Sequence, residues 1–265
     1  MTSSGGAGAK EQAREFLGLS FSNVDMAEAL DWLRGRTKDS QYAYVVTPNV
    51  DHMLNLQQDR VLRHIYQCAD LCLCDSRILA LLAGFGDVDL PVVPGSELVS
   101  RLLRSLEPGR TLCVIGSAAA AARLAELLPQ AKIACHVPPM GLRNDPAAQA
   151  GVVAFVRANP ADYILLAVGS PQQEMIADLM RRDGTVRGTA LCIGASISFF
   201  TGESKRAPQW MQRLSLEWAF RLSQEPRRLA HRYLIKGPAI FPLYAKWRLG
   251  KRRGGSAPTP REEHD

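Results

Sequence analysis

Asp75 is the residue of this chain best suited to general-base chemistry. It directly follows an apolar run at residues 71–74. A carboxylate at the end of a buried strand faces the ligand cleft of an open sheet, where desolvation tends to raise its pKa. The structural alternative is that Asp75 caps the helix that begins at residues 76–78, and the nearby Arg77 could hold Asp75 ionised in either case.

A second chemical signal is YILLAVGSPQQE at residues 163–174. The apolar run stops at Gly169, turns at Ser170-Pro171, and restarts with helical periodicity. A small-residue turn of this kind leaves free backbone N–H groups at a helix N-terminus, where the dipole favours a phosphate. Three polar side chains would then stand in the first helical turn, within reach of the group attached to that phosphate: Gln172, Gln173 and Glu174.

The third signal is Thr47-Pro48-Asn49, which closes the apolar run at residues 42–46. Pro48 cannot sit within a sheet ladder, so the strand ends there. Thr47 and Asn49 are then free to bind a ligand or to cap the helix that follows, and capping is the commoner role. Asp51, two residues after Asn49, is the reserve candidate base.

These signals share one arrangement, which predicts the fold. Further apolar runs end in small residues, at Gly116-Ser117 and at Gly194-Ala195-Ser196, and each run is followed by a helical segment. Alternating strands and helices predict a Rossmann-like α/β fold: an open parallel sheet with helices on both faces and its ligand at the carboxyl ends of the strands. No G-x-G-x-x-G follows any of these strands, so neither a dinucleotide cofactor nor an epimerase is supported.

The charge distribution separates a body from a C-terminal arm. Thirteen Lys and Arg residues against two Glu residues between Lys205 and Arg253 give the arm a charge of +11, although the whole chain carries only +6. We expect a disordered start at residues 1–15, a Rossmann-like domain at 16–204, a helical appendage at 205–250 and a disordered tail at 251–265. No apolar stretch approaches the roughly 20 residues of a membrane-spanning helix.

The arm combines aromatic and basic residues at helical spacing. Trp210, Met211, Leu214 and Trp218 form one face, and later segments interleave aromatics with cations. This pattern is typical of helices that lie on an anionic membrane surface. Ordinary core packing and a solvated basic tail are the structural alternatives. The charge alone would also allow nucleic-acid binding, but no RNA- or DNA-binding module accompanies it.

The six cysteines fit a reducing compartment. Cys72, Cys74, Cys113 and Cys192 lie within expected strands, where a free thiol acts as a small hydrophobe. None of the six has a metal-ligand spacing with a histidine, and no C-x-x-C is present. The sequence therefore predicts a cytoplasmic location and no metal site.

Four motifs together resemble the WecG/TagA/CpsF glycosyltransferase family. They are TPN at Thr47, ADLxLxD ending at Asp75, VGSPQQE ending at Glu174, and RAPQWMQRLSLEWAFRLSQEPRRLAHRY at residues 206–233. The resemblance spans residues 42–233, and the last motif is long and specific. It implies an inverting, metal-independent enzyme with no cofactor, which moves a sugar from a UDP-sugar to a polyprenyl-diphosphate-linked acceptor at the inner face of the plasma membrane. The polymers made by such enzymes include teichoic acid linkage units and xanthan-type exopolysaccharides.

The resemblance also implies roles for individual residues. Asp75 matches the proposed general base, Thr47 and Asn49 match positions beside the sugar donor, and Gln172, Gln173 and Glu174 match the donor-sugar contact region. The strand-end turns add further expected donor-binding residues, namely Gly116, Gly169, Ser170, Gly194 and Ser198. An arginine fork suits a departing diphosphate, which gains charge in the transition state. Arg221, Arg228 and Arg232 match basic positions of the family's C-terminal appendage, which are expected to steady that leaving group or the acceptor phosphates. Arg77 and Arg206 are expected to act with them.

The chain departs from the family at three positions. Ser76 stands where the family usually has Gly, Val92 where it has Arg, and Ser198 where it often has Asp. These differences are compatible with another donor sugar, with a substitute such as Arg77, or with a weakened enzyme. The alternative function is therefore a catalytically weakened, membrane-associated partner of a polysaccharide assembly complex. The sequence leaves both sugars, the polymer and the oligomeric state open, and a homo-oligomer is allowed.

Overall fold

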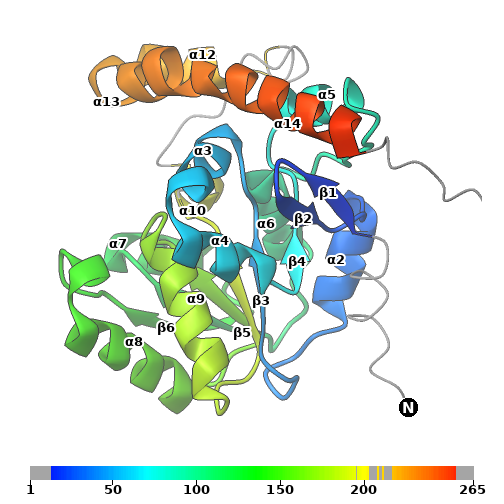
Figure 1. Cartoon of the computed structure of the whole chain (residues 1–265). Coiled ribbons are helices and arrows are strands. Elements are labelled where there is room, and N and C mark those ends of the chain that lie inside the picture. Colours follow the sequence, from blue (N-terminus) through cyan, green and yellow to red (C-terminus); the bar gives the residue numbers. More distant parts are fainter. Residues whose placement is uncertain (1–12, 195, 203–207, 209–210, 212–216, 255–265) are drawn as a thin grey trace, which may run out of the picture.

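The computed structural model describes residues 13–194, 196–202, 208, 211 and 217–254. Its centre is a six-stranded sheet in the order β4-β3-β8-β7-β5-β6, with every neighbouring pair parallel (Figure 1). The strands are β3 (Ala43–Val46), β4 (Leu71–Cys72), β5 (Thr111–Ile115), β6 (Lys132–His136), β7 (Tyr163–Leu166) and β8 (Thr189–Cys192). The predicted Rossmann-like α/β fold is confirmed.

Helices cover both faces of the sheet because alternate side chains of each strand point to opposite faces. Cys113 and Ile115 of β5 join the core beneath one set of helices, and Leu112 and Val114 join the core on the other face. The first set is α3 (Val50–Gln58), α4 (Arg60–Gln67), α5 (Arg77–Gly84), α8 (Pro146–Ala158) and α9 (Gln172–Asp183). The second is α2 (Met26–Arg34), α6 (Gly95–Arg104), α7 (Ala118–Leu127) and α10 (Ser196–Phe200).

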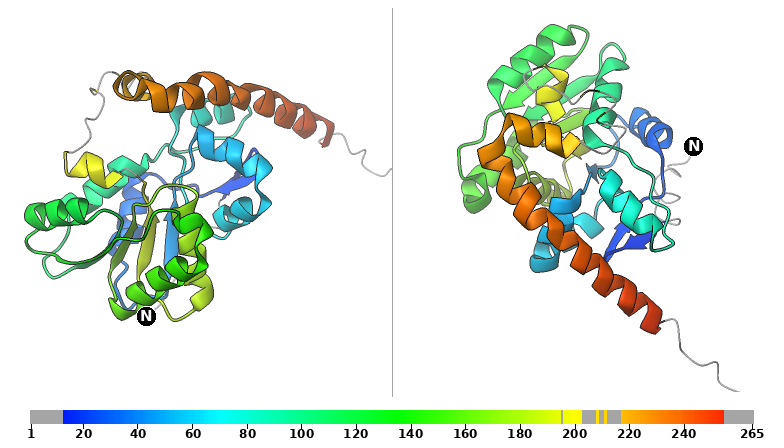
Figure 2. Two further views of the ribbon diagram at one scale, coloured as in Figure 1. Left: turned by 90° about the vertical axis from the view of Figure 1, so that its left-hand side faces the viewer. Right: turned by 90° about the horizontal axis from the view of Figure 1, so that it is seen from above.

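The arm is a succession of helical segments that crosses one end of the molecule (Figures 1 and 2). Its described parts are α12 (Glu217–Gln224), α13 (Pro226–Ala230), the π-helical η2 (His231–Lys236), the short η3 (Gly237–Ala239) and α14 (Ile240–Gly254). Trp247 of α14 packs edge-on against Phe16, with ring centroids 5.1 Å apart. Among the described residues, no helix has the length and apolar character needed to cross a bilayer.

Several elements differ from the sequence-based expectations. An antiparallel hairpin of β1 (Arg14–Phe16) and β2 (Leu19–Phe21) begins inside the range expected to be disordered, and α14 extends helical structure to Gly254, into the expected tail. Strand β6 was not among the strands predicted from the sequence. It is an edge strand whose residues are half-buried or exposed, which removes the apolar run that marks a central strand.

Gly188 is a position at which the fold admits only glycine. Its φ is +89°, and a Cβ there would lie 2.0 Å from the carbonyl oxygen of Ala161. We expect Gly188→Ala to lower the free energy of unfolding by about 2 to 4 kcal/mol, because strain and a backbone clash add. Gly151→Ala is the control, since nothing lies near its Cβ. Equal denaturant midpoints for the two variants would contradict this account.

Candidate active site

Asp75 and Thr47 meet at the carboxyl ends of the neighbouring strands β4 and β3. The N–H of Asp75 donates to the carbonyl of Pro48 at 3.1 Å, and an Asp75 carboxylate oxygen accepts from the N–H of Gly95 at 3.1 Å. Gly95 is also in close contact with Thr47, because a Cβ at Gly95 would lie 2.7 Å from Thr47 Oγ1. As the first residue of α6, Gly95 presents a helix N-terminus, where negative charge is favoured.

Asp75 does not cap the helix that follows it. Ser76 takes that position, and its hydroxyl accepts from the N–H of Leu79 in α5. Serine is a preferred N-cap, so Ser76 has a local structural role here. The Asp75 side chain is half-buried and directed to α6 instead.

Asn49 is an N-cap, as the structural alternative predicted. Its side-chain oxygen accepts from the N–H groups of Asp51 and His52, and His52 Nδ1 accepts in return from the N–H of Asn49. Burial lowers the pKa of His52, with the charges of Arg232 and Lys236 acting in the same direction. The ring is therefore neutral at physiological pH, which leaves Nδ1 able to accept.

The turns after β7 and β8 are joined by buried hydrogen bonds. Gln173 accepts from the N–H of Gly194 at 2.8 Å and donates to Glu174 at 2.8 Å. The same Glu174 oxygen accepts from the hydroxyl of Tyr66 at 2.9 Å, and burial together with that carboxylate raises the pKa of Tyr66 well above its usual range. Gln173 and Glu174 are buried whereas Gln172 is half-exposed, so these three residues have unlike environments.

Two buried oxygens beside this network lack a hydrogen-bond partner among the described residues: Ser170 Oγ and Glu174 Oε2. Buried polar atoms in native proteins are nearly always paired, so an unpaired one needs an explanation. Both atoms belong to the turn and first helical turn after β7. A polar ligand at this strand end would supply the missing partners.

Asp51 attaches the arm to the body. Its carboxylate pairs with Lys236 Nζ at 2.9 Å and with Arg232 Nε at 3.3 Å, and Lys236 also donates to Asn55. Burial alone would raise the pKa of Asp51, but the hydrogen bond from Lys236 and the charges of Arg232 and Lys236 bring it below its usual value. A carboxylate held by two cations is a poor proton acceptor, which argues against Asp51 as a base.

The remaining predicted site residues occupy varied positions. Gly116 is buried against Ala167, Ser198 is half-buried in α10, and Arg77 is exposed on α5. Arg206 lies outside the described residues, and only the backbones of Arg221 and Arg228 are described, in α12 and α13. Val92, one of the three positions at which the sequence was expected to depart from the family, forms a parallel bridge with Cys74 next to Asp75.

Sequence reasoning missed Gly95, Tyr66, His52 and Lys236. The place of Gly95 at the start of a helix is the one local signal that could have found it. The other three carry no motif. Tyr66 and Lys236 reach their partners across 108 and 181 positions of the chain respectively, which no local pattern encodes.

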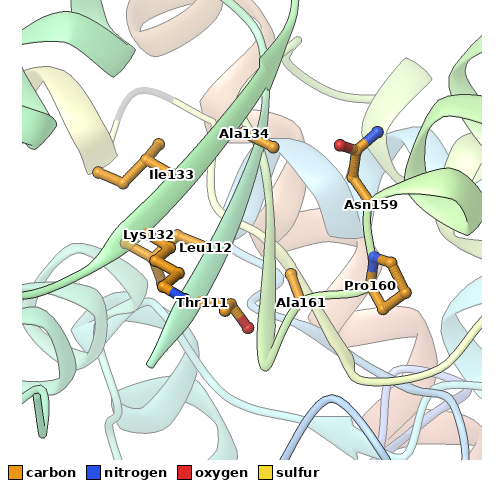
Figure 3. Close-up of a pocket in the computed structure, with 8 residues that line it drawn as sticks. All are labelled: Thr111, Leu112, Lys132, Ile133, Ala134, Asn159, Pro160 and Ala161. Atoms are coloured by element: carbon orange, nitrogen blue, oxygen red, sulfur yellow. The ribbon is translucent and has the colours of Figure 1, made fainter. Parts of the chain in front are cut away.

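A shallow hollow lies at the other end of the sheet (Figure 3). It is bounded by Thr111 and Lys132, the first residues of β5 and β6, and by the turn that precedes β7. None of the predicted site residues lines it. Ligands of open α/β sheets bind beyond the carboxyl ends of the strands, so this hollow is not the candidate site.

The Asp51 ion pairs should control docking of the arm. We expect Asp51→Asn to weaken docking by about 1 to 3 kcal/mol, because it removes a charge-assisted hydrogen bond and leaves two cations without their counter-ion. Hydrogen exchange should then speed up in residues 231–240. Asp31→Asn, which removes only an exposed pair with Arg34, is the control and should leave exchange there unchanged.

The same pairs predict an acid response. The pKa of Asp51 in the folded protein lies below its ordinary value of 3.8, so the full stabilisation is present above that value. It is lost as the pH falls through the lower folded-state pKa. Exchange in residues 231–240 that accelerates equally with acidification in wild type and in Asp51→Asn would contradict this assignment.

The model of the glycosyl transferase WecG/TagA/CpsF family matches residues 14–254. The match covers every strand, the carboxyl-end turns that hold Thr47, Asp75 and Gln173, and the arm through α14. The protein therefore belongs to the WecG/TagA/CpsF family of glycosyltransferases.

Proposed function

We propose that this glycosyltransferase moves a sugar from a UDP-sugar to a polyprenyl-diphosphate-linked saccharide, with inversion and without a metal, in the synthesis of an exopolysaccharide or other cell-surface polysaccharide. The observation that carries the proposal is the convergence of Asp75, Thr47 and the helix N-terminus at Gly95 in a chain of this family. The hexosyl or N-acetylhexosaminyl identity of the donor remains open.

In this mechanism Asp75 removes the proton from an acceptor hydroxyl. The oxygen attacks the anomeric carbon, the bond to UDP breaks, and the configuration at that carbon inverts. The N–H of Gly95 donates to one carboxylate oxygen of Asp75 at 3.1 Å and so orients the side chain at the end of β4. General-base catalysis of this type contributes a rate factor of about 10² to 10⁴.

The donor would occupy the ends of β3, β8 and β7. Ser170 Oγ and Glu174 Oε2 are the unpaired atoms available to it, and the N–H groups after Gly169 suit its diphosphate. Gln173 and Glu174 would act mainly by holding the turns at Gly194 and Ser170 in position, while Gln172 is accessible for direct contact. Thr47, Asn49, Gly116 and Ser198 complete the proposed donor region.

The arm would supply positive charge for the diphosphate leaving group. Arg232 of η2 pairs with Asp51 in the first turn of α3, and this ion pair holds it next to the carboxyl end of β3. Arg206, Arg221 and Arg228 are proposed to act with it from the arm, and Arg77 from the start of α5. As UDP departs its charge increases, so fixed cations stabilise the transition state more than the ground state.

The proposed location is the cytoplasmic face of the plasma membrane. The basic arm supports peripheral attachment to anionic lipid, which would bring the site to a lipid-linked acceptor. A weakened enzyme acting as an assembly partner is the second candidate, and it is favoured by Val92 next to Cys74, where the family has a cation. Arg77 is the proposed substitute for that lost charge.

Sugar transfer tests the proposal directly. We expect the purified protein, given lipid-linked acceptor and a panel of radiolabelled UDP-sugars, to move label from at least one donor into the lipid extract. Asp75→Asn should reduce kcat by about 10² to 10⁴, because it removes the base. Asp39→Asn, an exposed residue far from the carboxyl edge, is the control. Absence of transfer from every UDP-sugar would favour the partner-protein alternative.

Gly95→Ala should separate activity from stability. A Cβ there would displace Thr47 and shift the N–H that holds Asp75, although alanine favours the helix more than glycine does by about 1 kcal/mol. We expect kcat/KM to fall at least about tenfold, as small misplacements in an active site do. Gly151→Ala gains the same helix propensity and should keep full activity. Full activity in Gly95→Ala would remove Gly95 from the site.

A further inference from the structure

Helix α5 exposes a row of side chains that the site does not use. Its inner face buries Leu79, Leu82 and Ala83, but Leu81 and Phe85 on the outer side are 61% and 62% exposed. With Arg77 they follow the spacing i, i+4, i+8, which aligns them on one side of the helix. The row begins two residues after Asp75 and ends where α5 ends.

Helix α14 exposes a matching row. Ile240 is buried, and Leu243, Tyr244 and Trp247 pack against the core. The outward positions are Phe241, Ala245 and Leu249, again at i, i+4, i+8, and the two large side chains are 56% and 58% exposed. Lys246 and Arg248 stand beside this row, and residues 226–254 contain no Asp or Glu.

The two helices lie side by side (Figures 1 and 2). A Cβ at Gly86, just after α5, would lie 2.6 Å from the Trp247 ring, and Lys251 Nζ donates to the carbonyl of Gly86 at 3.0 Å. The contact fixes α14 on the end of α5. The exposed apolar side chains of both helices are therefore held on one rigid part of the molecule.

We infer that α5 is a second membrane-contacting helix, which binds an anionic lipid bilayer together with α14. This inference rests on the proposed membrane attachment of the arm and extends it to the catalytic body. Leu81 and Phe85 enter the interfacial zone of the bilayer beside Phe241 and Leu249, while Lys246 and Arg248 meet lipid phosphates. Because α5 starts beside Asp75, this contact sets the position of the proposed base relative to the membrane.

The composition of the surface favours lipid over a protein partner. Lysine is depleted from protein interfaces, whereas rows of apolar residues flanked by Lys and Arg are typical of helices that lie on membranes. Asp87 and Asp89, in the loop after α5, are exposed, and an anionic surface repels their negative charges. The α5 contribution should accordingly be apolar and insensitive to salt, and the α14 contribution should be electrostatic and weakened by salt.

Vesicle binding of the full chain tests the inference. We expect Leu81→Gln/Phe85→Gln to bind vesicles of phosphatidylglycerol and phosphatidylcholine at least about tenfold more weakly than wild type, at both low and high salt. The control is Val137→Gln/Met140→Gln, which removes two exposed apolar side chains after β6, at the opposite edge of the sheet. This control should bind like wild type.

A local probe makes the result independent of folding. Cys68 and Cys135 are half-exposed, so both are first changed to Ser. An environment-sensitive dye on Leu81→Cys should then shift to shorter wavelength with vesicles, and the same dye on Met140→Cys should not. Unchanged vesicle binding of the double variant, a dye at position 81 that stays in water, or a wild type that does not bind vesicles would each overturn the inference.

Two further measurements separate this inference from the proposed function. Leu81→Gln/Phe85→Gln should transfer sugar at the wild-type rate when a short-chain acceptor is dispersed in detergent, because no bilayer is needed there. No transfer by wild type in that assay would refute the proposed function, whereas vesicle binding tests α5 alone. Loss of a dimer in the double variant, seen by light scattering, would assign the surface to a second copy of the chain and overturn the inference.

Discussion

The parallel alignment of six strands is the constraint on which the rest of the molecule depends. Since every strand runs in the same direction, each turn that follows a strand emerges at one edge of the sheet. Residues as distant in the chain as Thr47, Asp75 and Gln173 are thereby brought to the same edge of the sheet. The local hydrogen bonds then set the final geometry, through Gly95 for Asp75 and through Gly194 for Gln173.

The arm completes this edge through two contacts of different chemistry. Near the strand ends it is held by charge, between Asp51 and the cations of η2. Farther along, it is held by the packing of Trp247 on Phe16 and on Gly86, which follows α5. An ion pair responds to salt and acid, whereas aromatic packing responds little to either. The two ends of the arm therefore differ in what can release them.

The sequence predicted the sheet and the proximity of Thr47 to Asp75, because apolar runs ending in small residues report central parallel strands directly. Edge strand β6 and the hairpin at Arg14–Phe21 were not predicted, because short or half-exposed strands lack such apolar runs. Within the candidate site, residue types pointed to Glu174 but could not show that it is buried against Tyr66. The cations that pair with Asp51 could not be predicted from the sequence either, because these ion pairs form only when the arm folds back on α3.

The packing of Phe16 on α14 has a consequence for biosynthesis. Phe16 is fully buried, and the rings that cover it, Tyr244 and Trp247, are made more than two hundred residues later. During translation the β1–β2 hairpin is synthesised first, and the Phe16 ring lacks these two partners until α14 has left the ribosome. Such long-range closure is slow, so the basic arm beside the carboxyl ends of the strands forms late in folding.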